Sequence, residues 1–234
     1  MRVNIEYGTK RLEIEVKYGK RKHLAVTVHP DKKVTVKAPA GCGKNLVQAL
    51  VKKRAAWIFR QIEYFDQFHP LQPERLYKSG ETHYYLGRQY RLRIRAGQKK
   101  RVRLRGGFFD LELPEPGDTQ KAKTLMENWY SSHAGTLLDR KVKQYLPYFL
   151  RLGAPEPTVK YRRMKRRWGS CSARGVITFN TEVVKAPVHC VDYVVIHELC
   201  HLLYLDHDQK FYRLLGRVLP DWEKRKKRLE KVVL

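Results

Sequence analysis

Apolar and polar residues alternate along the first forty residues of the chain, which is the pattern of β-strands with one buried face. The alternation is clear over residues 11–18, 24–28 and 34–36, and Pro30-Asp31 supplies a turn that would make the last two a hairpin. Apolar residues then recur at helical spacing over residues 44–68. The beginning of the chain is therefore expected to be β-rich with one long helix.

A second β pattern begins at Tyr84 and contains two segments in which every second residue is arginine. Residues 90–95 and 101–105, with a turn at 96–98, are expected to form a hairpin whose apolar residues pack inward. One continuous basic face would then carry Arg91, Arg93, Arg95, Arg101, Arg103 and Arg105. Like charges side by side repel, so a ligand with several phosphates would stabilise this face. A plain solvated surface is the alternative.

The segment from Pro114 to Asp118 is rich in residues that break regular structure, and it predicts a domain boundary. Two domains are expected, over residues 1–116 and 117–234. The second begins with a helical pattern over residues 119–150, which an interior glycine and an interior proline are expected to kink.

Shorter elements follow this helix. They are expected to be strands at 158–164 and 174–180 with a turn at 168–172, helices at 190–204 and 209–218, and a last helix from Pro220. Asp208 is the expected cap of the helix at 209–218. A second basic cluster lies at the end of the first of these strands, and it is another candidate for binding a polyanion. Its members are Arg162, Arg163, Arg166 and Arg167.

The helix predicted over 190–204 contains the sequence His197-Glu198-Leu199-Cys200-His201. Residues four apart lie on one face of a helix, so His197 and His201 can bind one cation while Glu198 accepts a proton from water on it. His207 is the expected third ligand. Three protein ligands leave the fourth position of a tetrahedral Zn²⁺ open for water, as in catalytic sites. A chance match is the alternative, and the helical context and the third histidine favour a true site.

Hydrolysis at such a site also needs a donor for the developing oxyanion. The candidates, among which the sequence does not choose, are Tyr204, Tyr212, Arg213 and His189. The strand predicted at 176–180 precedes the metal helix and would hold an extended peptide through main-chain hydrogen bonds if it lay at a sheet edge. An interior strand fits the pattern equally well.

The charge of the whole chain adds a class of partner. Its 234 residues carry a formal net charge of +26, with a sequence pI of about 10.1. Such a field attracts polyanions, including nucleic acid and nucleotides, although a merely solubilising surface is the alternative. The four cysteines lack the spacing of a disulfide framework, and no signal peptide or membrane span is evident. A cytoplasmic location is therefore expected.

Several segments together resemble the YgjP-like family of metal-dependent hydrolases, which are related to the SprT-like zinc peptidases. They are Ser79-Gly80-Glu81 with Tyr85-Leu86-Gly87, Trp168-Gly169-Ser170-Cys171-Ser172, Ile177-Thr178-Phe179-Asn180, and Tyr193 to His201 with His207 and Phe211. The resemblance implies one Zn²⁺ held by the three histidines, with Glu198 as the catalytic acid/base. The chain departs from the family pattern at Asp208 and Tyr212, which concerns substrate contacts rather than metal ligands.

Two functions follow from these residues and this resemblance. The first is a zinc peptidase, whose substrates include proteins bound to nucleic acid if it acts as the SprT-like relatives do. The second is a metal-dependent nucleoside triphosphate pyrophosphohydrolase, because such an activity, with UTP as substrate, is attributed to the family. The metal-binding residues, and the lack of an acidic cluster for magnesium, favour the peptidase. A nucleic-acid-binding module with a structural metal is a third hypothesis, disfavoured by the open ligand position.

The expected fold class is α+β. It combines a β-rich N-terminal domain that has one long helix with a zincin-like helical C-terminal domain. A small antiparallel sheet is expected beside the metal helix of the second domain.

Overall fold

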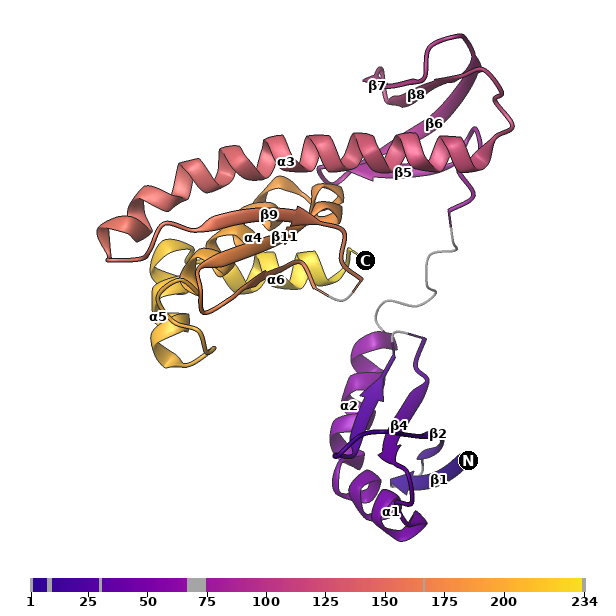
Figure 1. The fold of residues 1–234 in the computed structure, drawn as a ribbon, viewed down its shortest axis with the longest axis vertical. Helices are drawn as coiled ribbons and strands as arrows, with labels where there is room; N and C mark the ends of the chain where they lie inside the picture. Colours follow the sequence, from indigo (N-terminus) through magenta and orange to yellow (C-terminus); the bar gives the residue numbers. More distant parts are fainter. Residues whose placement is uncertain (1, 8–9, 30, 67–74, 166, 233–234) are drawn as a thin grey trace. The chain divides into compact units, whose positions relative to one another are not determined.

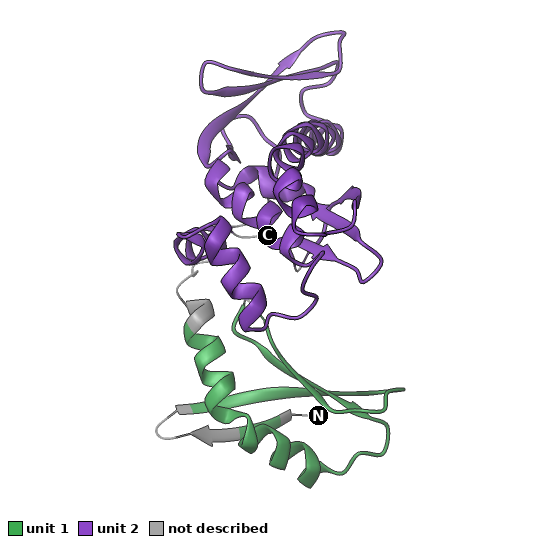
Figure 2. Cartoon of the chain, turned by 90° about the vertical axis from the view of Figure 1, so that its left-hand side faces the viewer, with its two compact units in different colours: residues 1–73 green, residues 74–234 purple. Residues whose placement is uncertain are grey.

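The chain forms two compact units, residues 1–73 and residues 74–234, in a computed structural model (Figure 2). The structure describes residues 2–7, 10–29, 31–65 with the backbone of 66, 75–165 and 167–232. Arg166, one of the expected polyanion-binding residues, lies outside the described residues. No helix in the described part of the chain is long and apolar enough to cross a lipid bilayer.

The first unit is a four-stranded sheet with two helices. Its elements are β1 (Arg2–Tyr7), β2 (Lys10–Gly19), β3 (Ala25–Val28), β4 (Val34–Pro39), α1 (Lys44–Lys53) and α2 (Ala55–Asp66), with strand order β1-β2-β4-β3. The hairpin expected between β3 and β4 is confirmed. The single helix expected over 44–68 is two helices, because α1 ends at Arg54, whose backbone N–H bonds back to Leu50 and Val51.

The second unit begins with another four-stranded sheet, of order β5-β6-β8-β7. Its strands are β5 (Thr82–Tyr85), β6 (Arg88–Ala96), β7 (Arg101–Arg105) and β8 (Phe108–Leu113). The predicted hairpin of the two arginine-rich strands is wrong. The alternation of β8, Phe-Phe-Asp-Leu-Glu-Leu, was not recognised, and this strand inserts between them, parallel to β6 and antiparallel to β7.

The helix α3 (Thr119–Arg151) joins this sheet to the rest of the unit (Figure 1). The Asp118 side chain caps it by accepting a hydrogen bond from the Lys121 N–H, and the helix runs on through Gly135 and Pro147. Residues three or four apart on one face of α3 are buried, among them Met126, Tyr130, Ala134 and Leu138. One core therefore extends from this sheet through α3 to the C-terminal helices.

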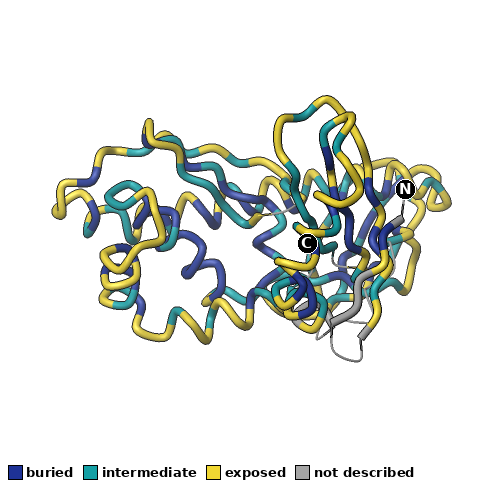
Figure 3. Tube along the Cα trace, turned by 90° about the horizontal axis from the view of Figure 1, so that it is seen from below, coloured by how far each residue is buried: buried dark blue, intermediate teal, exposed yellow. Residues whose placement is uncertain are grey.

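The domain boundary expected at residue 116 does not coincide with the boundary between the two compact units, which lies after residue 73. Leu92, Phe109 and Leu111 of the β5–β8 sheet share a core with Ile196 and Leu199 of the C-terminal half, whereas the buried residues of the first unit form a separate core. Figure 3 marks the buried parts of the chain in dark blue. The fold class is α+β, as the sequence predicted.

The remaining elements form a small sheet and three helices. They are β9 (Thr158–Arg162), β10 (Gly169–Cys171), β11 (Val176–Asn180), a 3-10 helix η1 (Thr181–Lys185), α4 (Val188–Cys200), α5 (Gln209–Val218) and α6 (Trp222–Glu230). The small sheet was expected to be antiparallel, but it is mixed. Its middle strand, β11, is parallel to β9 and antiparallel to β10. The segment expected as a plain turn contains β10.

The tight turn between β5 and β6 fixes the start of α4. Leu86 and Gly87 donate backbone hydrogen bonds of 2.7 and 3.2 Å to the carbonyls of Val184 and Lys185. Gly87 has φ of +79°, and a Cβ at this position would lie 2.7 Å from Cγ of Pro187, the residue preceding α4. Only glycine fits such a conformation and approach.

Candidate metal centre

Three imidazoles converge at the C-terminal end of α4. His197 lies in the last turn, His201 is the residue that caps the helix, and His207 lies in the loop before α5. One ligand atom of each lies within 4.8 Å of the others. The helix ends at Cys200 rather than at Tyr204 as expected, and this earlier end lets residues 202–208 return to the two helical histidines.

Two of the rings, those of His197 and His201, have a polar partner at Nδ1. His201 Nδ1 lies 2.9 Å from the Tyr204 carbonyl, to which it donates, and His197 Nδ1 lies 3.5 Å from the Tyr193 hydroxyl. Nε2 of His197 and Nε2 of His207 are 3.0 Å apart. Such partners orient the histidines of metal sites. Tyr193 was not anticipated, although its position four residues before His197 places it on the same helix face.

The three rings rest on Phe211. This side chain is fully buried, and its ring centroid lies 5.0, 4.6 and 4.7 Å from those of His197, His201 and His207. Asp208 accepts a hydrogen bond of 2.9 Å from the Phe211 N–H and so caps α5, as the sequence predicted. The start of α5 thereby positions the Phe211 side chain against the three imidazoles.

Burial keeps His197 and His207 in the neutral state that binds metal. It lowers the pKa of His197 to about 3, with His201, His207 and Lys226 adding to the effect, and it also lowers the pKa of His207, with His201 and Lys226 adding to the effect. Neutral imidazole is the ligand form, and it requires no displacement of a proton at neutral pH. The donor set therefore fits a divalent ion such as Zn²⁺.

Glu198 follows His197 on α4, and its carboxyl group is buried. Its exposure is 5%, and Oε2 has no hydrogen-bond partner among the described residues. Burial raises the pKa of Glu198 to about 8, against the opposing effect of Arg167. A Cβ on Gly169 of β10 would lie 2.5 Å from Glu198 Oε1, so any larger residue would displace the Glu198 side chain or β10. No pattern in the sequence indicates this contact.

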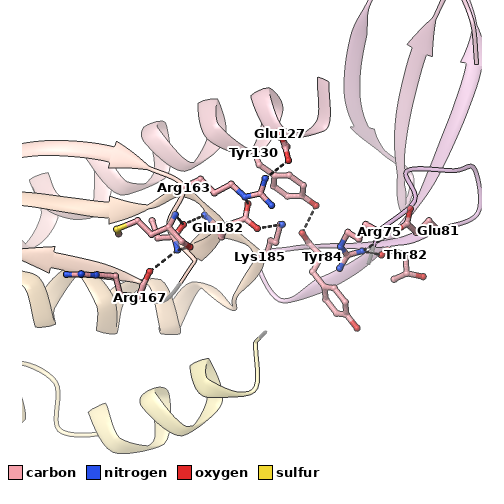
Figure 4. Close-up of polar contacts among 12 residues, drawn as sticks. Arg75, Glu81, Thr82, Tyr84, Glu127, Tyr130, Arg163, Arg167, Glu182 and Lys185 are labelled. Atoms are coloured by element: carbon pink, nitrogen blue, oxygen red, sulfur yellow. Dashed lines mark hydrogen bonds and ion pairs between the residues drawn. The ribbon is translucent and has the colours of Figure 1, made fainter. Parts of the chain in front are cut away.

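The basic loop before β10 is held by Asn180, which is fully buried. The Asn180 Nδ2 group donates to the carbonyls of Met164 and Arg167, at 2.7 and 2.8 Å. Its Oδ1 accepts from the N–H groups of Met164 and Glu182. In Figure 4 the Arg167 side chain points away from the polar contacts around Lys185. Asn180 therefore fixes the backbone from which Arg167 and Gly169 reach Glu198.

Replacing Asn180 by alanine should lower the free energy of unfolding by about 2–3 kcal/mol, because buried loop groups lose their partners. Urea denaturation measures the change. Gln98→Ala, at an exposed position, is the matched control and should change stability by less than about 0.5 kcal/mol. Equal effects of the two substitutions would contradict this role of Asn180.

Arg163, expected to bind a polyanion, contacts acidic residues of the protein itself (Figure 4). It forms ion pairs with Glu127 and, at 3.8 Å, with Glu182. Lys185 also contacts Glu182, at 2.5 Å, and burial lowers the pKa of this lysine. This network joins α3, the basic loop and η1. Arg162 and Arg167 are exposed.

The expected oxyanion donors lie in different places. The Tyr212 ring is 6.1 Å from that of His207 and stacks on Trp222 at 5.3 Å. Tyr204 contributes its carbonyl to His201. Arg213 is exposed, with no described contact to the cluster. His189 is exposed in the first turn of α4, eight residues before His197 and so about 12 Å along the helix.

Three converging imidazoles and a buried glutamate that follows the first of them on the same helix are the residues of His-Glu-x-x-His metallohydrolases. The chain matches the YgjP-like metallopeptidase domain over residues 22–232, and it belongs to the YgjP-like family. Membership makes it a hydrolase of the metallopeptidase type, which implies a divalent metal ion. The predicted resemblance is confirmed.

The comparison with solved structures adds a partial likeness. The crystal structure of the metallopeptidase zymogen of Pyrococcus abyssi abylysin is 25% identical in sequence, with a TM-score of 0.33. The match covers 41% of this chain and 90% of that one. No curated protein matches the chain significantly.

Proposed function

We propose that this protein is a zinc-dependent peptidase. His197, His201 and His207 would bind one Zn²⁺, and Glu198 would be the catalytic acid/base. The observation that carries the proposal is the convergence of three ligand atoms within 4.8 Å beside a carboxyl group that is 5% exposed. A structural zinc site would need a fourth protein ligand, and no further His, Cys, Asp or Glu joins this group among the described residues.

The residues divide the chemistry among them. The bound ion would supply Lewis-acid polarisation of the scissile carbonyl and would lower the pKa of water. Glu198 accepts the proton of the attacking water and delivers it to the leaving amine. Because burial raises its pKa to about 8, this carboxylate holds a proton more readily than an exposed glutamate. Gly169 leaves Glu198 the space to do so.

An extended peptide would bind along β10. The strand expected to bind it, β11, is interior, whereas β10 lies at the edge of its sheet. Asn180 N–H bonds to the Trp168 carbonyl and Ser172 N–H to that of Val176, so these alternate residues of the β10 segment face β11. Gly169 and Cys171 then direct their backbone groups to the open edge. A substrate that adds as a strand there would pass Glu198.

Oxyanion stabilisation belongs to the same proposal. Among the expected donors within the described residues, Tyr212 has its ring near that of the ligand His207. We therefore assign oxyanion stabilisation to Tyr212 ahead of Tyr204 and Arg213. Lys226 lies close enough to lower the pKa of His197 and His207, and it was not foreseen, because nothing distinguishes it from the other basic residues of α6.

Pyrophosphohydrolysis of a nucleoside triphosphate, with UTP as the expected substrate, is the second candidate. It is favoured by two cations whose charge acts on the site: Arg167 lowers the pKa of Glu198, and Lys226 lowers those of His197 and His207. Neither forms an ion pair with a carboxylate of the described residues. A cytoplasmic location and a polyanionic partner also remain predictions.

A paired assay distinguishes the two substrates. Chelation should abolish hydrolysis, and one equivalent of Zn²⁺ per chain should restore it, because the three histidines form one candidate site. The reloaded protein would be offered an unfolded protein, with and without DNA, beside the four nucleoside triphosphates. Cleavage of the protein alone supports the peptidase, and release of pyrophosphate alone supports the second candidate. Full activity after chelation would contradict both.

A further inference from the structure

The outer face of the β5-β6-β8-β7 sheet carries charged groups and an aromatic ring that the metal centre does not use. The register of β6, β8 and β7 sets up three rows: Arg91–Phe108–Arg105, Arg93–Asp110–Arg103 and Arg95–Glu112–Arg101. The opposite face packs into the core beside α3, close to its N-terminal part (Figure 1). The residues in these rows therefore face solvent.

Two of the six arginines are neutralised within the sheet. Arg93 makes a two-pronged contact with Asp110, at 2.5 and 2.9 Å, and Arg101 contacts Glu112 at 2.6 Å. The expected continuous basic face is therefore wrong, because β8 places two carboxylates in its middle. Four exposed arginines remain, and none of them forms an ion pair with a described carboxylate. They are Arg91, Arg95, Arg103 and Arg105.

Phe108 lies among these charges on the side of the sheet that does not pack into the core. Its side chain is half-buried, and the Arg93 guanidinium lies 4.3 Å from its ring centroid. Asp110 accepts two hydrogen bonds along one edge of that guanidinium, so it cannot swing freely away from the ring. A planar cation held on an aromatic ring offers a flat surface on which a nucleobase can stack.

We propose that this face binds single-stranded nucleic acid, with the four unpaired arginines on phosphates and the Arg93–Phe108 pair against a base. Arg103 and Arg105 are two residues apart on β7 and so about 6.6 Å apart, a spacing that suits successive phosphates, and Arg91 and Arg95 are four residues apart on β6, about 13 Å. Cationic side chains around a stacking platform are the combination used by single-strand binders. A duplex keeps its base faces stacked inside, so it has no use for Phe108.

Fluorescence anisotropy with the full-length protein and a labelled oligothymidylate tests whether the four unpaired arginines bind phosphates. The variant Arg91→Gln/Arg95→Gln/Arg103→Gln/Arg105→Gln should bind at least about tenfold more weakly, and the slope of log K against log salt should fall by up to about 3. The control removes four exposed charges elsewhere in the same unit: Arg140→Gln/Lys143→Gln/Arg151→Gln/Arg174→Gln. Equal losses in both variants would show that only net charge matters and would overturn the proposal.

Phe108→Leu tests the stacking part. It should weaken binding of oligothymidylate about fivefold or more without changing the salt slope, and circular dichroism checks that the sheet remains folded. A duplex should bind more weakly than the single strand and should not respond to this substitution. A duplex that binds as tightly as the single strand, or an affinity for the single strand that Phe108→Leu leaves unchanged, would overturn the proposal.

Discussion

Glu198→Gln should reduce hydrolysis by about 10²–10⁴-fold while Zn²⁺ still binds with a stoichiometry of one. Glutamine has nearly the same shape as glutamate but cannot accept the proton of the attacking water. The three histidines do not depend on the charge of this carboxyl for their orientation, since their partners are Tyr193, Tyr204 and Phe211. Metal analysis and the rate with the substrate found in the paired assay measure the two effects.

Glu156→Gln is the matched control, because Glu156 is exposed and remote in sequence from the metal-binding motif. Its rate should equal that of the unchanged protein. Hydrolysis at full rate by Glu198→Gln would remove this residue from the mechanism, and loss of Zn²⁺ from that variant would show that Glu198 supports the metal site instead.

Gly169→Ala should also abolish most of the hydrolysis, although it touches no metal ligand. The added methyl group would lie 2.5 Å from Oε1 of Glu198 and 2.7 Å from its Cγ and Cδ. Either β10 or the Glu198 side chain must move, and misplacement of a catalytic group by about 1 Å costs on the order of 10²-fold in rate. Zn²⁺ binding should be retained, and the loss should appear in kcat.

Gly117→Ala provides the comparison, because nothing lies within 4 Å of a Cβ built at Gly117 and its φ is not positive. That variant should keep full activity. Normal kcat in Gly169→Ala would mean that Glu198 has room elsewhere, and the close packing of β10 against the carboxyl would then be irrelevant to catalysis.

Local patterns in the sequence predicted most of the single elements. The span of α5 and its Asp208 cap are as expected, since both depend on neighbours within four residues. The break at Arg54 and the strand β8 were missed. In β8 the alternation is short and contains two acidic residues, so it resembles a polar connection until its partners on both sides are known.

The arginine-rich strands show the limit of local reasoning. Their alternation correctly placed Leu92 and Leu104 toward the core. It could not reveal that a third strand separates them, because strand order is set by pairing between distant segments. That order supplies Asp110 and Glu112 to two of the arginines and leaves Phe108 on the solvent side.

The sequence alone determined that His197 and His201 share one helix face, since a spacing of four residues is a property of the helix itself. It also determined the chain's family and its α+β class. Only the tertiary structure decided that His207 returns to the same point, that Phe211 lies beneath the three rings, and that β10 comes so close to Glu198 that Gly169 is required. These contacts join residues brought together by packing, for which no periodicity along the chain gives a signal.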